Sequence, residues 1–397
     1  MAGARESLGI YGHVPFCKHA CPYCDFYKME LRERPARARL DFPGQLRREV
    51  DLLLGVYPEM AERPLETVYF GGGTPSTLVP EAVGELLAHW KGLFVECGGR
   101  EFTLEANPEN LTENRARQWH AAGFTRLSIG AQSFHPEELG LLERLHGPET
   151  IEEAVRRSRR AGFGNVSLDL MFALPGQTME RWMENLRRAV ALEPDHVSFY
   201  GLTWHEGTPF EAWKREGRLA ELGDELQAEM YLRGADFLEG EGFEHYEISN
   251  FARPGFRSRH NARYWTGRDV LGVGPGAHSR MGPERWRNPE DLEGWAAALA
   301  AGRVPREPAE RPGPEEAAWE RLFTGLRRTE GLGRGEAPEL VEACRRWHGA
   351  NLPESAAWME AGPEGVRLTR EGGLLSDAIL EGLLREVIGA GGHSSLQ

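Results

Sequence analysis

The sequence predicts an α/β fold: a partial (β/α)6 barrel of the TIM type, followed by a small, mainly helical C-terminal domain. Short apolar runs rich in β-branched residues alternate with segments of helical periodicity from residue 8 to about residue 240, which indicates βαβ units and a parallel sheet. Five of the six runs carry a chemically distinctive residue at or near their ends. Ligands bind beyond the carboxyl ends of such strands, and five of these ends converge best on a curved sheet. A doubly wound sheet is the alternative.

The expected strands, in chain order, are residues 8–14, 67–72, 101–107, 126–131, 165–173 and 196–203. Helical spacing of apolar residues is clear between them, over 43–57, 80–94 and 151–163. The distinctive features at the strand ends are a cysteine group, a Gly-rich turn, Glu105, Gln132 and Asp169.

Composition divides the chain into four regions. We expect the barrel over 1–240, and extended or irregular structure packed on it over 241–300, where Gly, Pro, Arg and aromatic residues are frequent. A linker rich in Pro, Arg and Glu then leads into a helical C-terminal domain over 301–390. Residues 391–397 are expected to be disordered.

Charge and hydropathy exclude several classes of protein. The formal net charge of -14 argues against a nucleic-acid partner, because binding phosphates requires a basic surface. No apolar run approaches the roughly 18 residues that span a bilayer, and the first residues do not resemble a signal peptide, so we expect a cytoplasmic protein. Five cysteines, an odd number with three close together, favour a metal site over a disulfide framework.

The three clustered cysteines are Cys17, Cys21 and Cys24, in the spacing C-x-x-x-C-x-x-C, with Tyr23 before the last one. Structural zinc takes four ligands, and no second pair elsewhere completes a tetrahedron. A four-iron cluster normally takes one thiolate per iron, so three thiolates leave one iron open for a substrate. Chance clustering or a weak zinc site is the alternative.

This motif resembles that of the radical S-adenosylmethionine (SAM) superfamily. The resemblance implies a 4Fe–4S cluster whose open iron chelates the amino and carboxylate groups of SAM. The turn Gly72, Gly73 and Thr74 follows a strand and is similar to the motif that holds the SAM amino group. The carboxylate of Glu105 could bridge two ribose hydroxyls.

The order and spacing of further residues resemble the coproporphyrinogen oxidase-like branch of this superfamily. Taken singly, Arg144 is more often a surface residue and Asp169 a buried structural acid. The resemblance implies that SAM is contacted by Tyr11, Tyr23, Gly72, Gly73, Thr74, Glu105, Gln132, Arg144 and Asp169.

The run "HNARYW" supplies His260, Asn261, Tyr264 and Trp265. Histidine is a common axial ligand of haem, and aromatic rings offer a flat apolar surface to a macrocycle. The run could also be a packed loop over the barrel mouth. It resembles the haem-associated motif of HemW-like heme chaperones, which implies haem as cargo at these four residues. It also implies client haemoproteins that receive the haem, an electron donor for the cluster and, in many members, a homodimer. Membrane-associated clients are compatible with a chain that has no membrane segment.

Two residues favour the chaperones over oxygen-independent coproporphyrinogen III oxidase. Asp25 and Phe26 stand where the oxidase has a Gly-Cys pair. The cysteine motif also begins at Cys17, which leaves little room for the oxidase's longer N-terminal segment. The oxidase, and a passive haem carrier that needs no cluster, remain alternative hypotheses. The sequence assigns no catalytic residue and leaves open whether SAM is cleaved productively. We expect Cys97 and Cys344 to be structural or incidental.

Overall fold

The computed structural model describes residues 6–33 and 36–391 of the 397-residue chain. The predicted disordered tail therefore lies outside the described residues, apart from Gly391, which ends the last helix. Residues 1–5 of the predicted barrel region lie outside them as well.

The core of the molecule is an eleven-stranded sheet with the order β13-β12-β11-β1-β4-β5-β6-β7-β8-β10-β9. Neighbouring strands from β11 to β8 are parallel. The six predicted strands are confirmed as β1 (Leu8–Val14), β4 (Leu65–Gly72), β5 (Glu101–Ala106), β6 (Arg126–Gln132), β7 (Asn165–Phe172) and β8 (His196–Gly201). Among the described residues β13 and β9 are the edges of this sheet, so the barrel is partial.

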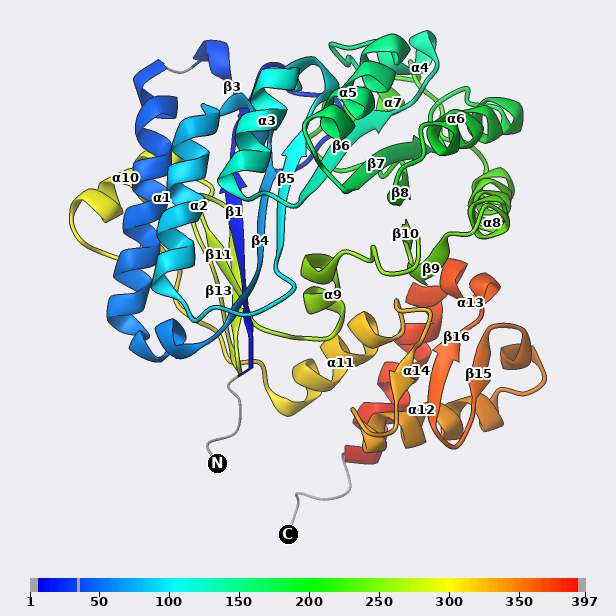
Figure 1. The fold of residues 1–397 in the computed structure, drawn as a ribbon. Helices are drawn as coiled ribbons and strands as arrows, with labels where there is room; N and C mark the ends of the chain where they lie inside the picture. The colour runs from blue at the N-terminus through cyan, green and yellow to red at the C-terminus, as the bar shows by residue number, and fades with distance from the viewer. Residues whose placement is uncertain (1–5, 34–35, 392–397) are drawn as a thin grey trace.

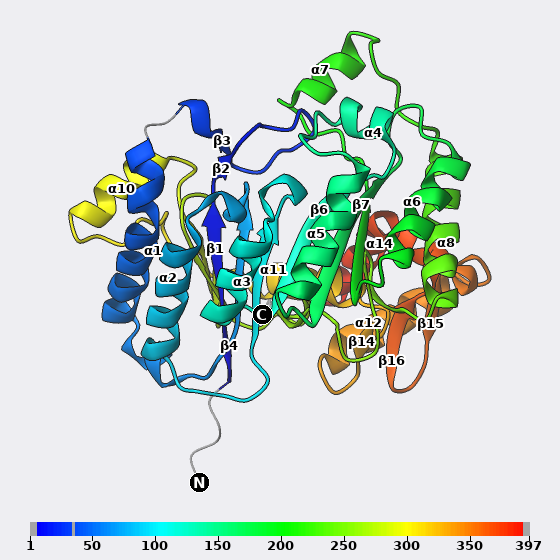
Figure 2. The same ribbon diagram turned by 45° about the horizontal axis from the view of Figure 1, so that its top comes forward.

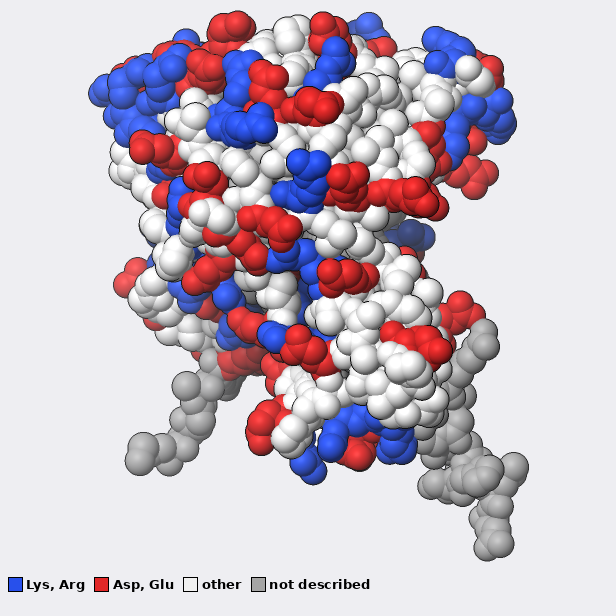
Figure 3. Space-filling model, turned by 90° about the vertical axis from the view of Figure 1, so that its right-hand side faces the viewer, with Lys and Arg blue, Asp and Glu red and all other residues white. Residues whose placement is uncertain are grey.

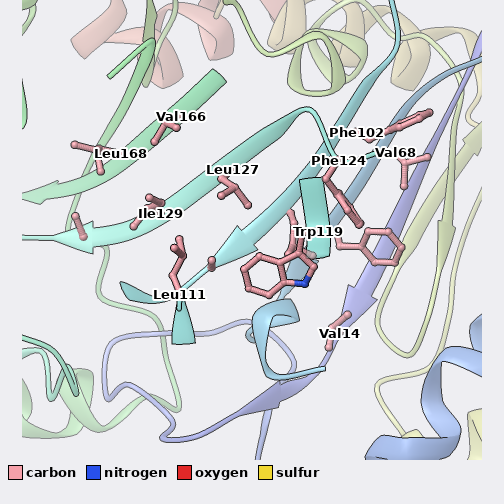
Figure 4. Close-up of a cluster of buried hydrophobic side chains, with 14 of the residues drawn as sticks. Val14, Val68, Phe102, Leu111, Trp119, Phe124, Leu127, Ile129, Val166 and Leu168 are labelled. Atoms are coloured by element: carbon pink, nitrogen blue, oxygen red, sulfur yellow. The ribbon is translucent and has the colours of Figure 1, made fainter. Parts of the chain in front are cut away.

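The helices that connect or follow these strands are α1 (Ala36–Val56), α2 (Pro80–Leu93), α3 (Glu113–Ala122), α4 (Pro136–Leu141), α5 (Pro148–Arg160), α6 (Met179–Ala191), α7 (Pro209–Arg215) and α8 (Asp224–Gly240). Most of them lie along one face of the sheet (Figure 1), whereas α7 lies at the top of Figure 2, beyond the strand ends. Figure 4 shows Leu127 and Ile129 of β6 in the buried apolar cluster that also contains Trp119 of α3. Because side chains alternate along a strand, Arg126 and Ser128, which alternate with Leu127 and Ile129, face the barrel interior.

Segment 241–300, expected to be extended or irregular, consists of short regular strands and two helices. This segment forms β9 (Glu244–Glu247), β10 (Asn250–Ala252), α9 (Arg259–Trp265), β11 (Val270–Val273), β12 (His278–Met281), β13 (Glu284–Arg287) and α10 (Leu292–Ala300). Its strands are three or four residues long, too short for an alternating pattern to appear in the sequence. They form because the barrel sheet already offers unpaired edges: β10 pairs with β8, and β11 pairs with β1.

The C-terminal part has its own apolar core, which contains Leu322, Val341, Cys344 and Leu380. Its helices are α11 (Pro314–Gly325), α12 (Pro338–Ala350), α13 (Arg370–Leu374) and α14 (Ser376–Gly391). A three-stranded antiparallel sheet packs with them, formed by β14 (Leu332–Gly333), β15 (Met359–Ala361) and β16 (Gly365–Leu368). This part lies below α8 and β9 in Figure 1 and is mainly helical, as predicted.

The short elements complete the described chain. They are β2 (Phe16–Cys17), β3 (Met29–Glu30) and the 3-10 helices η1 (Leu31–Glu33), η2 (Pro58–Glu62), η3 (Pro75–Thr77), η4 (Pro108–Asn110) and η5 (Glu354–Ala357). Within the described ranges, no helix is long and apolar enough to cross a bilayer. Acidic and basic side chains are interspersed on the face of the molecule drawn in Figure 3.

Candidate cofactor-binding cleft

A cleft of about 440 Å³ opens beyond the carboxyl ends of the parallel strands. The predicted residues that line it are Cys17, Cys21, Tyr23, Cys24, Gly72, Gly73, Thr74, Glu105, Gln132, Arg144, Asp169 and Asn261. Four predicted residues lie outside this lining: Tyr11, His260, Tyr264 and Trp265. The structure therefore brings the predicted cluster ligands and nearly all the predicted SAM contacts to one place, and adds one residue of the predicted haem motif.

The cysteine loop is fixed to the barrel by its own side chains. Cys17 ends β2 and is buried. The two ring nitrogens of His19 lie 3.1 Å from Glu30 and 2.7 Å from Glu143, so this histidine braces the loop. The Tyr23 ring packs edge-on against Phe210 of α7, with 6.0 Å between the ring centroids.

Burial raises the pKa of the Cys17 thiol to about 11 and also raises the pKa of Cys24. Cysteine binds metal as the thiolate, so positive charge must compensate for burial at this loop, and iron is suited to supply it. Within the described residues, no three side chains of Cys, His, Asp or Glu are arranged to hold a single metal ion. A four-iron cluster makes a different demand, because each thiolate binds a separate iron.

The glycine turn after β4 packs directly on the cysteine loop. Gly72 has a φ of +104°, and a Cβ atom there would lie 2.7 Å from the His13 ring. A Cβ atom at Gly73 would lie 3.0 Å from Cys17 Sγ. Both positions require glycine: a side chain at Gly72 would meet the His13 ring with a strained backbone, and one at Gly73 would fill the space beside the thiol. The hydroxyl of Thr74 donates to Cys17 Sγ at 3.5 Å.

Tyr11 and His13 stand behind this turn on β1. His13 is buried, with Nε2 2.8 Å from the Tyr27 carbonyl and Nδ1 3.3 Å from the Tyr11 hydroxyl. Burial lowers the pKa of His13, which favours the neutral ring. His13 thus connects β1 to the end of the cysteine loop, while Tyr11 stacks near Tyr69 at 6.2 Å outside the cleft lining.

Two half-buried carboxyl groups face the middle of the cleft. Glu105 accepts a hydrogen bond from the Tyr69 hydroxyl at 2.7 Å, and Asp169 accepts one from Ser128 at 3.1 Å. Burial raises the pKa of Glu105 to about 7, and the negative charge of Asp169 adds to this effect. The pKa of Asp169 is raised as well, chiefly by burial. Both groups are poised to accept hydrogen bonds from a polar ligand near neutral pH.

Arg144 and Gln132 hold the side of the cleft nearest the cysteines. The Arg144 guanidinium donates to Cys21 Sγ at 3.4 Å, to Asn107 Oδ1 at 2.7 Å and to the Gly130 carbonyl at 3.0 Å. Gln132 has a φ of +64° at an irregularity in the pairing of β6 with β7, and its buried Oε1 has no hydrogen-bond partner among the described residues. A strained backbone that presents an unused polar atom is typical of a binding site.

The segment "HNARYW" forms α9, at the opposite end of the cleft from the cysteines. Glu101 fixes its first turn, because its carboxylate accepts the N–H groups of Arg259 and His260, each at 3.0 Å. His260 is buried, with Nδ1 2.8 Å from Thr67 Oγ1 and Nε2 3.3 Å from the Tyr264 hydroxyl. Burial, with the nearby arginine charges, lowers the pKa of His260 to about 3, so the ring is neutral.

The other members of this motif differ from His260 in exposure. Tyr264 is 42% exposed, Trp265 is half-buried, and Asn261 lines the cleft. Sequence reasoning missed Asn107, Arg126 and Asn250, which also line the cleft. The sequence offered one sign of this lining: polar residues at alternate positions of 126–131, starting with Arg126, indicate that this face of the strand points into the cleft.

These residues fit a 4Fe–4S cluster and SAM. Three thiols stand beside a turn that only glycine can occupy, and unused polar atoms face the same space. A partial parallel barrel with such a group at the carboxyl ends of its strands defines a class of proteins that bind their cofactor inside the barrel mouth.

Comparisons with known proteins specify that class. The sequence profile described as the Radical SAM superfamily matches residues 11–189. The heme chaperone HemW of Mycobacterium tuberculosis is 34% identical over 389 residues, covering 96% of this chain and 95% of that protein. The heme chaperone HemW of Bacillus subtilis is 34% identical over 82% of this chain and 84% of its own length. The chain belongs to the radical SAM superfamily and, within it, to the family of HemW-like heme chaperones.

A solved structure shows the same fold. Coproporphyrinogen III oxidase (HemN) from Escherichia coli superimposes with a TM-score of 0.79 over 96% of this chain and 90% of that one. Its sequence identity is 22%, so this likeness concerns architecture. It agrees with the predicted partial barrel and C-terminal domain.

Proposed function

We propose that this protein binds haem and delivers it to client haemoproteins, with a 4Fe–4S cluster and SAM governing assembly or release. The observation that carries the proposal is the 34% identity to the mycobacterial heme chaperone over nearly the whole of both chains. Likeness along the full length covers the cysteine loop and the α9 motif together. An electron donor for the cluster, a homodimer and a cytoplasmic location belong to the same proposal.

The cleft residues would share the cofactors as follows. Cys17, Cys21 and Cys24 would each hold one iron, and the turn at Gly72 and Gly73 would offer backbone groups to the SAM amino group. Glu105 would accept the ribose hydroxyls of SAM once its carboxyl group is ionised. A cluster with SAM on its open iron supplies one-electron reductive chemistry, while the protein positions the ligand and excludes water.

The haem would contact the side of α9 that carries Asn261, Tyr264 and Trp265, which share one face of the helix at spacings of three and four residues. Tyr264 is exposed and Trp265 is half-buried, so their rings can offer apolar surface to a macrocycle. His260 is a different case, because both of its ring nitrogens already have neighbours within the protein. An iron ligand at His260 would require the contact with Thr67 or with Tyr264 to break.

The test is haem transfer by the anaerobically reconstituted protein. Protein loaded with haem is mixed with a purified apo-haemoprotein client, with and without SAM and reductant, and formation of the holo-client is followed by absorption. We expect transfer that depends on the cluster. Equal transfer by a variant without the three cysteines would favour the passive carrier instead, and absence of haem binding would exclude both.

The oxidase alternative is tested separately. Asp25 Oδ2 lies 3.1 Å from His205 Nδ1 at the cleft rim, and Phe26 is 63% exposed. The motif resemblance places a Gly-Cys pair of the oxidase at these positions, so its additional cysteine is replaced here by a phenylalanine. We expect no protoporphyrinogen IX from coproporphyrinogen III, SAM and reductant. Formation of this product over many turnovers would replace the chaperone proposal.

A further inference from the structure

Arg126 is a buried cation that the functions described above do not use. It is the first residue of β6, it lines the cleft, and it is 1% exposed. Its Nε and Nη1 atoms are buried and have no hydrogen-bond partner among the described residues. None of the ion pairs found within residues 6–33 and 36–391 includes it.

Such a group is costly unless something pairs with it. A guanidinium has five N–H donors and keeps its charge, so burying it without acceptors loses hydration that nothing replaces. The neighbouring acids do not fill this role. Glu105 already accepts from Tyr69 and Asp169 from Ser128, and Arg126 acts on both only through space, lowering their pKa values.

The surroundings of Arg126 offer further polar atoms to a ligand. Asn250 and Asn261 line the same cleft, and the buried Oδ1 of Asn250 has no partner in the described part of the chain. Arg126 pairs in register with Thr103 of β5, which pairs with Tyr69 of β4, and the Tyr69 ring stacks on His260 of α9 at 5.2 Å. The guanidinium therefore lies toward the α9 end of the cleft.

The position along β6 separates this cation from the cysteine end of the expected SAM site, where the SAM carboxylate would bind. Arg126 begins the strand and Gln132 ends it, and the cysteine loop lies beyond the end. At that end Arg144 already donates to Cys21 Sγ. A carboxylate that binds the open iron would meet Arg144, which leaves Arg126 for a different carboxylate.

We propose that Arg126 binds a propionate carboxylate of the haem cargo at the floor of the cleft, beside Asn250 and Asn261. The guanidinium fork matches a carboxylate with two parallel hydrogen bonds, and such bonds are strong where water is excluded. The inference rests on the proposed haem binding and adds to it one chemical requirement, a free carboxylate on the macrocycle.

The experiment compares haem with haem dimethyl ester, which has no free propionate, on the full-length reconstituted protein. R126M keeps an unbranched, apolar stem and removes the guanidinium with its charge. R188M is the matched control, because Arg188 of α6 contacts Glu152 and the Phe134 carbonyl and does not line the cleft. We expect wild type and R188M to bind haem at least about tenfold more tightly than R126M does. The dimethyl ester should bind all three proteins equally.

Several results would overturn the inference. These are equal haem affinity in wild type and R126M, an equal loss for haem and its ester in R126M, or a loss of SAM binding alone. Circular dichroism and the urea midpoint check that R126M folds. If it does not fold, R126K and the ester comparison on wild type decide, because equal affinity of wild type for haem and ester contradicts the proposal. Wild type that binds no haem would refute both the proposed function and this inference, whereas haem binding that ignores Arg126 would refute only the inference.

Discussion

The two ends of the cleft carry the two motifs that the sequence singled out, and they differ in which atoms remain free. At the cysteine end, the three thiols line the open space and Gln132 presents an unused Oε1. At the α9 end, both ring nitrogens of His260 already meet Thr67 and Tyr264. A motif therefore indicates where a ligand site lies, but its members divide between contacting the ligand and holding the fold.

The physical reason lies in where each motif sits on the sheet. The cysteine loop and the glycine turn follow strand ends, where the backbone leaves the sheet and side chains can face the mouth. Helix α9 packs against β4, away from the strand ends. Its first buried residue, His260, must therefore find hydrogen-bond partners for its ring nitrogens within the protein. The predictions that follow test this division.

The largest effect is expected at the cysteine end. Replacing Cys17, Cys21 and Cys24 by alanine should abolish iron and sulfide incorporation, because each thiolate binds a separate iron. Iron and sulfide analysis with EPR of the reduced protein measures this. In wild type, SAM should change the reduced cluster signal, since it would occupy the open iron.

Cys97→Ala is the control for this change. The Cys97 thiol donates to the Leu65 carbonyl at 3.3 Å, outside the cleft, so the variant should keep the full iron content. An equal loss of iron from Cys97→Ala would show that general instability, rather than ligation, explains the triple variant.

At the α9 end, a substitution of His260 should lower the stability of the fold. His260→Ala removes a buried ring and leaves the Thr67 hydroxyl without its partner, which should lower the free energy of unfolding by about 2–4 kcal/mol. Urea unfolding of the protein without haem measures this. A variant of unchanged stability whose haem spectrum is lost would instead mark His260 as the iron ligand.

The pH dependence of SAM binding examines the middle of the cleft. The pKa of Glu105 is about 7, and only its ionised form accepts two ribose hydroxyls, so SAM affinity should rise by up to about tenfold per pH unit below 7 and level off above it. Because the folded pKa exceeds the usual value of about 4.3, this group makes the protein without SAM less stable as pH rises from about 4.5 to 7. Calorimetric titration of SAM between pH 6 and 8 measures the first effect.

Glu105→Gln provides the matched comparison. It removes the titrating group and keeps the shape, so its SAM affinity should be lower and nearly independent of pH over the range where wild type varies. If the SAM affinity of Glu105→Gln still changed with pH, the titrating group would be Asp169 instead, whose pKa is also raised by burial.

Sequence reasoning predicted the barrel well because its strands are long and β-branched and its ligand-binding residues follow strand ends. It did not resolve the individual elements of 241–300, where strands such as Val270–Val273 depend on pairing with β1 rather than on local pattern. It also missed Arg126, because a single arginine at the start of a strand looks like a surface charge until the curved sheet buries it. The sequence could not predict that the His260 ring bonds to Thr67, because the two residues are far apart along the chain.

The smallest change in stability is expected at Tyr264. This residue should also separate most clearly the part of α9 that contacts haem from the part that stabilises the fold. Its ring is 42% exposed and its hydroxyl lies 3.3 Å from His260 Nε2, so Tyr264→Ser should cost less than about 1 kcal/mol of unfolding free energy. If the macrocycle stacks on this ring, haem affinity should nevertheless fall by about two- to tenfold, which haem titration measures. Tyr264→Phe, which keeps the ring and loses the hydroxyl, should bind haem as wild type does. An equal loss of haem affinity in Tyr264→Phe and Tyr264→Ser would mean that the hydroxyl, rather than the ring, is needed for haem binding. Tyr264 would then act together with His260, to which its hydroxyl is bonded.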